Sequence, residues 1–339
     1  MDYESIRAKV LPHHRLEGAG LTRSGLRRAL EDGTWVQIHR GWYVAGEHWK
    51  VAYAEERHLL AVFAAHEAAR GAGPVFAIAS AGVAWELPLF RVWPRSVHII
   101  GPANDGQVRP GRRSDPDGMT PPRVAHHDIP IPDEDVTQRW GVACTTLERT
   151  VYDVIRVFSR EAAVACMDAA LRRMAAPSGD ARDYDDADAE EFRGRVRARI
   201  AQNAGARGIR QARWVCEFGD GRAELPGESV SRVYLNDLGF RGIRTQVPVP
   251  GPRGTDYRVD FGIEDALAWG EFDGEGKYTD PELLRGRTRE DVVREEKERE
   301  DWIRATTGRG FGRWQMAQLE SPETLGGHLA ALGIRPRPS

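Results

Sequence analysis

Length, composition and charge place this chain among globular proteins with more than one domain. At 339 residues it exceeds the size at which a single hydrophobic core usually grows, so two or three domains are expected. Hydrophobic residues at 41% and charged residues at 29% exclude a disordered or membrane-embedded class. With a net charge of −3 the whole chain is not basic, so any nucleic-acid-binding surface must be local.

No segment of the sequence predicts export or insertion into a membrane. The longest apolar stretch, residues 75–90, is interrupted by Glu86 and Pro88 and is shorter than the roughly 20 residues of a spanning helix. The amino terminus lacks a basic segment followed by an apolar one, so no secretory signal is expected. The three cysteines lie too far apart to suggest a zinc site or a disulfide framework. We therefore expect a cytoplasmic protein with no membrane partner.

The first 50 residues carry the pattern of a winged-helix DNA-binding domain. A short helix is expected over residues 13–19, and Thr22 is placed to cap a second helix that reaches Glu31. The aromatic and β-branched run over residues 34–44 predicts two short strands. An ordinary solvated helix face is the alternative to DNA contact for the basic side chains. The predicted DNA-contacting residues are Arg23, Arg27, Arg28 and Arg40.

Residues 51–174 alternate helical and strand patterns and are expected to form an α+β domain. A helix over 54–70 and a strand over 97–100 precede a loop rich in Gly, Pro and Asp. Either Thr145 or Thr146 is expected to cap a helix ending near Phe158, and Ser159 to cap the next one. No catalytic constellation is predicted in this region.

Residues 175–223 change in composition from acidic to arginine-rich. The acids concentrated over 175–191 predict a mobile linker, and arginines follow from Arg193 to Arg213. These arginines could bind phosphates or be neutralised within the chain, and neutralisation is the favoured interpretation. The segment is therefore interpreted as an acidic linker followed by arginine-rich helices.

Residues 224–320 predict the element order α-β-β-β-α-β, and residues 321–339 a carboxy-terminal tail. A two-residue turn at 264–265 would place Asp260 opposite Trp269 across a hairpin. Asp260 and Glu271 would then share one sheet face on a diagonal of about 7 Å, together with Asp273. The expected elements cover residues 227–238, 243–249, 257–263, 267–272, 288–306 and 311–316.

Carboxylates that converge on one sheet face predict a divalent-metal site. Two such groups repel each other unless a cation lies between them, and Mg²⁺ characteristically takes one or two carboxylates together with phosphate oxygens. The alternative is a salt bridge, because the same register would place Arg258 directly opposite Glu271. A salt bridge would not account for Asp260, so we favour Mg²⁺ or Mn²⁺.

Four short motifs resemble those of PD-(D/E)XK nucleases of the very-short-patch-repair-like type. They are Gly227-Glu228-Ser229, Arg258-Val259-Asp260-Phe261, Gly270-Glu271-Phe272-Asp273-Gly274 and Arg294-Glu295-Glu296-Lys297. The resemblance implies a restriction-endonuclease-like fold in which Asp260 and Glu271 are metal ligands and Glu228 is the helical acid that joins them. Asp273 stands where the family usually has a lysine, so that lysine must come from elsewhere.

The missing lysine leaves several candidates for the catalytic set. Lys277, in a Gly-rich loop, is better placed than Lys297 of the long helix. Glu296 and Arg299 lie near the apolar stripe of that helix, where they either face the site or form an i, i+3 ion pair. The predicted catalytic residues are therefore Asp260, Glu271, Asp273, Lys277, Lys297 and Glu296.

The amino-terminal half of the chain resembles a different protein family. Residues 21–44 resemble the winged-helix domain of AbiEi-type antitoxins, and Ser80-Ala81 with residues 145–153 resemble the region that follows it in that family. This resemblance implies DNA binding, autoregulation and a toxin or defence-system protein as partner.

Taken as a whole, the sequence predicts an α/β multidomain protein that binds DNA. The predicted function is that of a divalent-metal-dependent endonuclease, in bacterial defence or DNA processing. The alternative is an antitoxin-like transcriptional regulator whose nuclease-fold domain is catalytically inactive. Neither interpretation specifies an oligomeric state.

Overall fold

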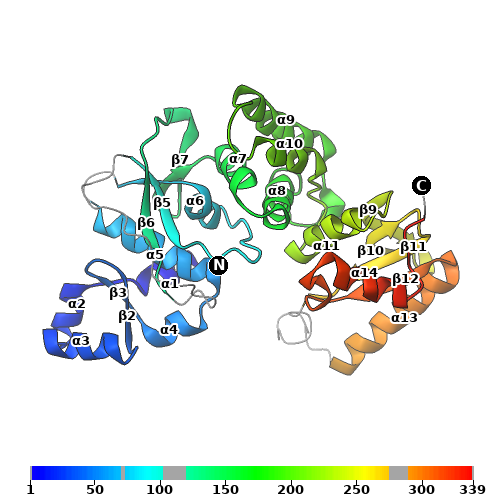
Figure 1. The fold of residues 1–339 in the computed structure, drawn as a ribbon. Helices are drawn as coiled ribbons and strands as arrows, with labels where there is room; N and C mark the ends of the chain where they lie inside the picture. The colour runs from blue at the N-terminus through cyan, green and yellow to red at the C-terminus, as the bar shows by residue number, and fades with distance from the viewer. Residues whose placement is uncertain (1, 70–72, 102–119, 275–288, 338–339) are drawn as a thin grey trace. The chain divides into compact units, whose positions relative to one another are not determined.

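The protein is described by a computed structural model that covers residues 2–69, 73–101, 120–274 and 289–337. The chain divides into two compact units, each built from two stretches of sequence. The first unit comprises Met1–Cys166 and Gly194–Arg213, and the second comprises Met167–Arg193 and Trp214–Ser339. The fold is mixed α/β, with separate sheets in the two units (Figure 1). In the described ranges no helix is long and apolar enough to cross a membrane.

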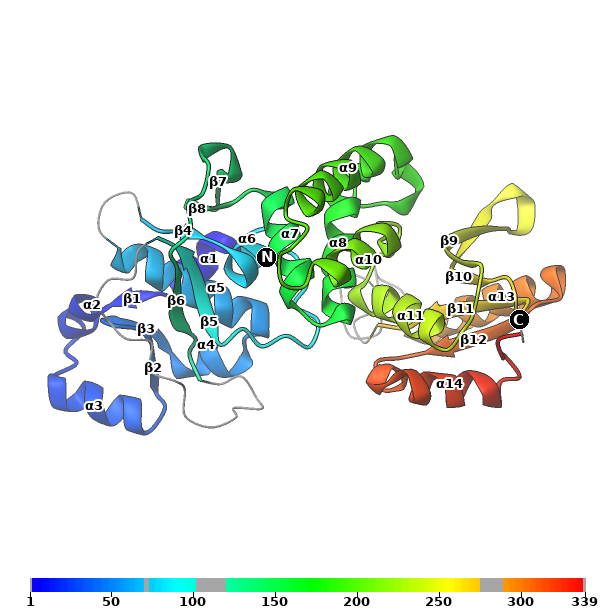
Figure 2. The same cartoon turned by 45° about the horizontal axis from the view of Figure 1, so that its top comes forward.

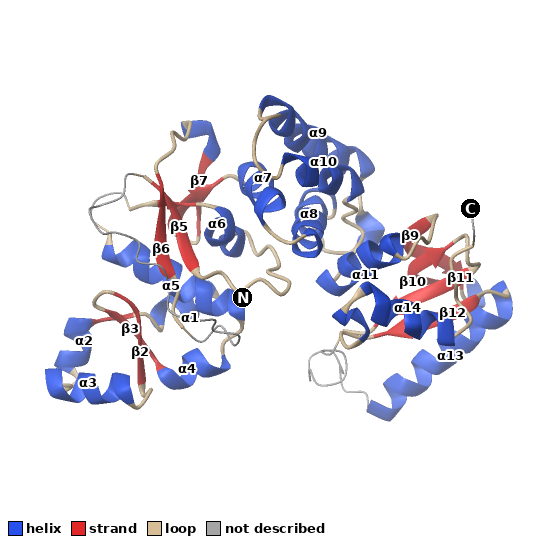
Figure 3. Ribbon diagram, viewed as in Figure 1, coloured by secondary structure: helices blue, strands red, loops and turns tan. Residues whose placement is uncertain are grey.

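After a first helix, α1, the first unit has the predicted order of helix, turn, helix and hairpin (Figure 3). Thr22 caps the second of these helices as predicted, since its Oγ1 accepts the N–H of Gly25 at 3.1 Å. A two-residue strand that the sequence did not predict completes the sheet, whose order is β1-β3-β2. The elements are α1 (Tyr3–Ala8), β1 (Leu11–Pro12), α2 (His13–Gly18), α3 (Arg23–Glu31), β2 (Trp35–His39), β3 (Trp42–Ala45) and α4 (Gly46–Val51).

The rest of the first unit is organised around a sheet of order β6-β5-β4-β8-β7. Thr146 rather than Thr145 caps α7, because its Oγ1 accepts the N–H of Arg149 at 3.4 Å. Ser159 accepts the N–H of Ala162 at the start of α8, as predicted. The elements are α5 (Ala54–Ala68), β4 (Val75–Phe76), α6 (Ile78–Ala84), β5 (Ser96–Ile100), β6 (Arg123–His127), β7 (Val136–Arg139), β8 (Val142–Thr145) and α7 (Leu147–Val157). Helix α8 (Arg160–Ala175) begins in this unit and continues into the second from Met167.

The expectation of a mobile linker over residues 175–191 is wrong. The segment contains the 3-10 helix η2 (Ala181–Asp183) and the start of α9 (Asp186–Gln202), and α10 (Ile209–Phe218) follows. Asp185 stabilises the start of α9 by accepting backbone N–H groups through its Oδ1. Acidic residues here cap a helix, which composition alone does not reveal.

Arginines of this segment are neutralised within the chain, as favoured from the sequence, although two acids come from outside the acidic run. Arg193 pairs with Glu190 at 3.1 Å. Arg199 pairs with Asp135 at 2.5 Å and with Glu148 at 2.9 Å. These contacts account for part of the arginine cluster without a phosphate.

The second unit contains the predicted α-β-β-β-α-β order around a sheet of order β12-β11-β10-β9. Strand β12 runs parallel to β11, and the other neighbours are antiparallel. The elements are α11 (Pro226–Asp237), β9 (Ile243–Pro250), β10 (Asp256–Ile263), β11 (Ala268–Phe272), α13 (Arg289–Thr307) and β12 (Gly310–Trp314).

The expectation of a carboxy-terminal tail is wrong, because residues Pro322–Ala331 form helix α14. Ser321 caps it by accepting the N–H of Thr324, and Leu325 and Leu329 are fully buried. Both leucines lie one turn apart on a single helix face, which is the spacing of a packed helix. Residues 322–331 are therefore part of the folded second unit.

Helices cover both faces of this sheet (Figure 2). On one face Trp314 donates from Nε1 to Ser231 of α11, and Gly312 lies against Leu329 of α14. On the other face Trp269 packs in a cluster with Ile303 of α13. Because side chains alternate along a strand, these contacts identify which residues face α11 and which face α13.

A buried ion pair ties α11 to α8. Arg232 of α11 donates to Asp168 at 2.8 Å, and both side chains are almost fully buried. The partners are 64 residues apart in sequence. Asp168 also accepts the N–H of Asp220 at 2.7 Å, so one carboxylate joins three parts of the second unit.

The predicted hairpin register is wrong by two residues. Gly262 pairs with Trp269 and Ile263 with Ala268, which leaves a four-residue connection instead of two residues. The connection closes with a hydrogen bond from the N–H of Leu267 to the carbonyl of Glu264, and Leu267 has a φ of 48°. Continuing this register brings Asp260 level with Glu271. The expectation that Arg258 lies opposite Glu271 is therefore wrong.

Candidate functional site

Strand β10 loses its regular alternation at Asp260. On an ordinary strand Val259 and Phe261 would share a face. Here Val259 packs in the α13-side cluster, whereas Phe261 stacks on Trp314 of the α11 side with ring centroids 5.4 Å apart. On the neighbouring strand, Gln246 has a φ of 50°, in the left-handed region that non-glycine residues rarely adopt. The two irregular positions face each other, because the register pairs the residues on either side of them.

This irregularity leaves the Asp260 carboxylate at the open end of the ladder between β10 and β11. Pairing of the two strands ends at Phe261 and Gly270. Just beyond it, Asp260 Oδ2 accepts the N–H of Phe272 at 2.8 Å, and Oδ1 accepts from Gln246 Nε2 at 3.2 Å. The carboxylate is therefore held in a defined orientation by one backbone group and one side-chain amide.

Glu228 reaches the same amide from the first turn of α11. Its Oε2 accepts from Gln246 Nε2 at 3.3 Å and from the N–H of Glu224 at 2.9 Å. Gly227 permits this approach, because a Cβ at that position would lie 2.2 Å from the ring of Phe272. Only glycine therefore lets α11 pack this close to β11 and bring Glu228 beside the strand residues.

Glu228 and Asp260 form an electrostatically unfavourable pair. Glu228 is only 3% exposed, and burial together with the nearby charge of Asp260 raises the pKa of its carboxyl group to about 8. Both carboxyl groups bind the single Gln246 amide nitrogen, which has two hydrogens to donate. At neutral pH the protonated form of Glu228 is therefore favoured in the absence of a cation.

Glu271 is held by two arginines. Its Oε1 lies 2.5 Å from Arg299 Nη1 of α13, and its Oε2 lies 3.0 Å from Arg313 Nη2 of β12. Asp273 approaches the same Arg313 at 3.5 Å. Burial opposes the charge of Arg313, but Asp273, Glu271 and other acids raise its pKa overall. A salt bridge thus satisfies Glu271, with partners other than the Arg258 considered from the sequence.

The single face predicted for these acids is not what the structure has. Glu271 and Asp273 lie against an arginine on the α13 side of the sheet. Asp260 is instead bound to Gln246, which it shares with Glu228 of α11. Among the residues that the structure describes, no group of three or more His, Cys, Asp or Glu side chains is arranged to hold a metal ion. The predicted trio of Glu228, Asp260 and Glu271 is thus not assembled as a cage.

The remaining predicted catalytic residues lie apart from this pair or outside the described residues. Lys277 falls in residues 275–288, which the structure does not describe. Lys297 is exposed on α13. Glu296 Oε2 lies 3.6 Å from Arg313, and Arg299 also donates to the carbonyl of Arg258. Glu296 and Arg299 thus both turn toward the sheet, as one of the two sequence interpretations expected.

Three residues of the site were not singled out from the sequence as functional. Gln246 has a polar amide within a run of buried strand residues, and this pattern could have identified it as a candidate site residue. Arg313 follows the alternation of β12 and faces the acids of β11 in register with Glu271. Arg182 lines the same cavity as Gln246, but it lies in the segment interpreted as a linker, so the sequence did not indicate it.

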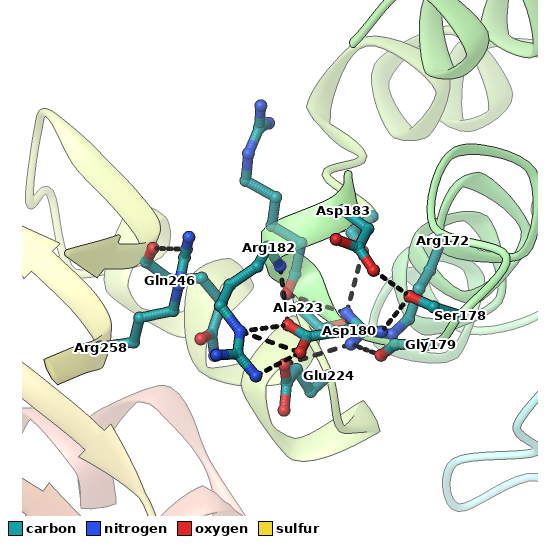
Figure 4. A network of polar contacts seen from close by, with 12 residues as sticks. Arg172, Ser178, Gly179, Asp180, Arg182, Asp183, Ala223, Glu224, Gln246 and Arg258 are labelled. Carbon is teal, nitrogen blue, oxygen red and sulfur yellow. Dashed lines mark hydrogen bonds and ion pairs between the residues drawn. The ribbon is translucent and has the colours of Figure 1, made fainter. Parts of the chain in front are cut away.

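A polar cavity of about 870 Å³ adjoins the paired acids within the second unit. Its walls come from loop residues 178–182, from Glu224, and from strands β9 and β10. Gln246 belongs both to the cavity wall and to the acid pair. Figure 4 shows this loop beside Gln246 and Arg258. The cavity therefore reaches the side chain that binds both acids, and it is large enough for a polar ligand.

The first unit presents a separate basic surface. Arg23, Arg27 and Arg28 are exposed on α3, and Arg40 is exposed where β2 turns into β3. Leu26 is buried on the opposite side of α3 in a core with Leu16 and Tyr43. The predicted separation of a basic and an apolar helix face is therefore present. A hollow of about 430 Å³ lies between α3 and the start of α2.

The structure itself shows the broad class of the protein, a multidomain α/β fold. No protein-family model matches the chain, and no solved structure matches it. Two uncharacterized proteins, from two strains of Mycobacterium tuberculosis, are each 33% identical to it over 150 residues. The match covers 44% of this chain and 50% of each relative, so the chain spans about half the length of the curated relatives it matches.

Proposed function

We propose that the second unit is a divalent-metal-dependent phosphodiesterase that cleaves DNA, with Glu228 and Asp260 as its central acids. The observation that carries the proposal is the Gln246 amide, which binds both carboxyl groups at the point where β9 and β10 are distorted. Distorted backbone and closely spaced acids, of which Glu228 is buried and Asp260 half-buried, are features that concentrate at functional sites, because both cost stability.

The element order of the second unit supports the same proposal. Helix α11, three antiparallel strands, helix α13 and the parallel strand β12 follow the order that the resemblance to PD-(D/E)XK nucleases implies. Asp260 and Glu271 occupy neighbouring strands, and Glu228 lies in the preceding helix, as that resemblance requires. The restriction-endonuclease-like domain thus remains part of the proposal.

The donor set fits Mg²⁺ or Mn²⁺. Such an ion takes one or two carboxylates and completes its shell with water and phosphate oxygens, so Glu228 and Asp260 suffice as protein ligands. Burial and the nearby charge of Asp260 raise the pKa of Glu228, and a bound cation would lower it again. Gln246 could present its amide oxygen after a rotation that exchanges oxygen and nitrogen. When bound, the ion would supply a polarised phosphate and an activated water.

The chain's own residues position the reacting groups. The Phe272 N–H fixes one oxygen of Asp260 and leaves the other directed toward Gln246. The salt bridges of Glu271 with Arg299 and Arg313 join β11, α13 and β12 behind the site, which gives Glu271 a positioning role in this arrangement. Lys277 and Lys297 stay candidates for the family's lysine.

The first unit contributes DNA binding in this proposal. Its helix, turn, helix and hairpin order with exposed Arg23, Arg27, Arg28 and Arg40 fits a winged helix whose α3 enters a groove. A toxin or defence-system protein as partner, and a place in bacterial defence or DNA processing, follow from the antitoxin resemblance and belong to the same proposal.

Plasmid nicking tests the proposed activity. Supercoiled plasmid is incubated with Mg²⁺ or Mn²⁺ and with the wild type, Glu228→Gln, Asp260→Asn or Glu264→Gln. Glu264 is a matched control because it pairs with Arg244 and Arg309 at the far end of β10. We expect nicking by the wild type and the control, and at least 100-fold less by the two site variants. Equal activity of all four proteins would show that the site is wrong.

A second candidate is the regulator with a catalytically inactive nuclease fold. It is favoured by the arginines that occupy both oxygens of Glu271, and by Asp273 in the place of a lysine. In that case the wild type binds DNA and cleaves none under any metal condition. The plasmid assay together with a binding measurement therefore separates the two candidates.

A further inference from the structure

The loop that walls the cavity is organised around one carboxylate. Asp180 caps η2 by accepting the N–H of Arg182 at 2.8 Å. The guanidinium of Arg182 folds back on the same carboxylate, with Nη2 2.6 Å from Oδ2 and Nε 3.1 Å and 2.9 Å from the two oxygens. Figure 4 shows this fork between Arg182 and Asp180, with Gln246 and Arg258 nearby.

A second guanidinium belongs to the opposite wall. Arg258 of β10 lines the cavity, and its Nη1 donates to the carbonyl of Gln246 at 2.8 Å. The hydrogen bonds from Arg182, with a smaller contribution from the charges of Arg182 and Arg258, lower the pKa of Asp180 to about 2. Two arginines from separate segments thus act on one oxyanion beside the acid pair.

An exposed ion pair of this kind can be exchanged. Arg182 is 72% exposed and Asp180 37% exposed at the side chain, and pairs so exposed contribute little stability. A phosphate offers the same spacing of oxygens to a guanidinium fork as a carboxylate does, and the hydrogen bonds are of the same charge-assisted kind. A phosphate entering the cavity therefore meets donors that are already arranged for an oxyanion.

We propose that Arg182 and Arg258 bind a backbone phosphate of the nucleic-acid strand, and that Asp180 occupies this phosphate site in the free protein. The proposal rests on the proposed function, since it names the groups that hold the substrate strand beside Glu228 and Asp260. Asp180 acts as an internal competitor, and its charge weakens binding.

The balance of charges in the cavity explains why a competitor matters. Glu224 also lines the wall but is paired with Arg172 at 3.2 Å, and Asp256 adds one more negative charge. The acids thus offset the arginines, and the cavity is not an open basic patch. A strand gains a phosphate contact here by displacing Asp180 from Arg182, so removal of that single charge favours binding.

Three substitutions test the proposal with opposite expected signs. Asp180→Asn removes the charge and keeps the cap, because asparagine caps helices as well as aspartate does. Arg182→Ala and Arg258→Ala each remove one proposed phosphate ligand. Affinity for a fluorescent 20-nucleotide strand is measured by anisotropy in EDTA over a range of salt concentrations, so that binding is observed without cleavage.

We expect Asp180→Asn to tighten binding about 3- to 10-fold and each arginine variant to weaken it by a similar factor. The dependence of log affinity on log salt should lose about one unit of slope for each arginine removed. Every protein is also measured with Arg27→Ala in α3, so that DNA contact by the first unit does not mask the effect.

Two variants at a remote ion pair serve as matched controls. Glu264→Gln makes the same change in net charge as Asp180→Asn and also unpairs arginines, and Arg244→Ala matches the arginine variants. Glu264 directly follows the last residue of β10 and lies six residues from Arg258, about 20 Å away. Both controls should bind as the wild type does.

The outcomes separate this inference from the proposed activity. Unchanged or weaker binding by Asp180→Asn overturns the inference, and so does an equal gain with Glu264→Gln, which would reflect net charge alone. Failure of the wild type to cleave with Mg²⁺ or Mn²⁺ overturns the proposed activity but leaves the binding result standing.

Discussion

The buried carboxyl group of Glu228 makes the stability of the metal-free protein depend on pH in a definite direction. Its pKa is about 8 in the folded protein, against 4.5 for an ordinary glutamate. The folded state therefore holds a proton that the unfolded state has lost. The associated stability is fully present below pH 4.5 and is lost as the pH rises to about 8.

The size of the effect follows from the two pKa values. At 1.36 kcal/mol for each pH unit between them, the full difference corresponds to at most about 5 kcal/mol. The part of this range between pH 5 and pH 8 corresponds to about 3 kcal/mol. Glu228→Gln, a neutral isostere, should lack this loss and be more stable than the wild type at pH 8.

Urea denaturation in EDTA at pH 5, 6.5 and 8 measures the difference between the two proteins. Asp168, whose pKa burial raises to about 6, titrates in both proteins and cancels in the comparison. Mg²⁺ should raise the Tm of the wild type more at pH 8 than at pH 6, and should raise that of the variant little. Parallel stability curves from pH 5 to pH 8 would refute the assigned protonation of Glu228.

Three further predictions concern the packing around the site. Gly227→Ala should destabilise the protein by about 1 to 3 kcal/mol in urea denaturation, because its Cβ would overlap the Phe272 ring, and full stability would contradict the close approach of α11. Glu271→Gln should cost about 3 kcal/mol at pH 7, because it leaves partly buried Arg299 and Arg313 without their carboxylate; an unchanged Tm would show that the salt bridges are dispensable. Leu329→Ala should cost about 2 to 5 kcal/mol if α14 is part of the folded unit, whereas a tail would show no change.

Local signals in the sequence were sufficient to predict most elements. Thr22, Thr146 and Ser159 cap the helices for which they were proposed, because capping depends on a few neighbouring residues. The α-β-β-β-α-β order was also predicted, since each element has its own apolar periodicity. The helix after Ser321 was missed, although a cap and two leucines one turn apart mark its start.

Site geometry could be predicted only in part, because it depends on the backbone between the predicted elements. The acids were identified by position, but their faces were derived from regular alternation and a two-residue turn. A left-handed residue at Leu267 lengthens that turn, and a second one at Gln246 accompanies the break in alternation beside Asp260. Neither left-handed residue is a glycine, the residue type that would have indicated this backbone conformation from the sequence.

The partners of Glu271 could not be predicted for a different reason. Arg299 and Arg313 come from the next helix and the last strand, and a contact over that sequence distance depends on how the elements pack. The sequence offered Arg258 only because the assumed register placed it opposite Glu271. The correct type of interaction was therefore considered with the wrong arginine.

The buried ion pair of Asp168 and Arg232 determines which truncated fragments of this protein can keep the acid site intact. A fragment that starts at residue 224 would keep every strand beside the acids and yet carry Arg232 into the interior without its carboxylate. It would also lack Asp180 and Arg182, and with them one wall of the cavity. A fragment meant to retain the acid site must therefore include the part of α8 that carries Asp168. Such a fragment also contains residues Gly194–Arg213, which belong to the first unit and interrupt the second unit in sequence.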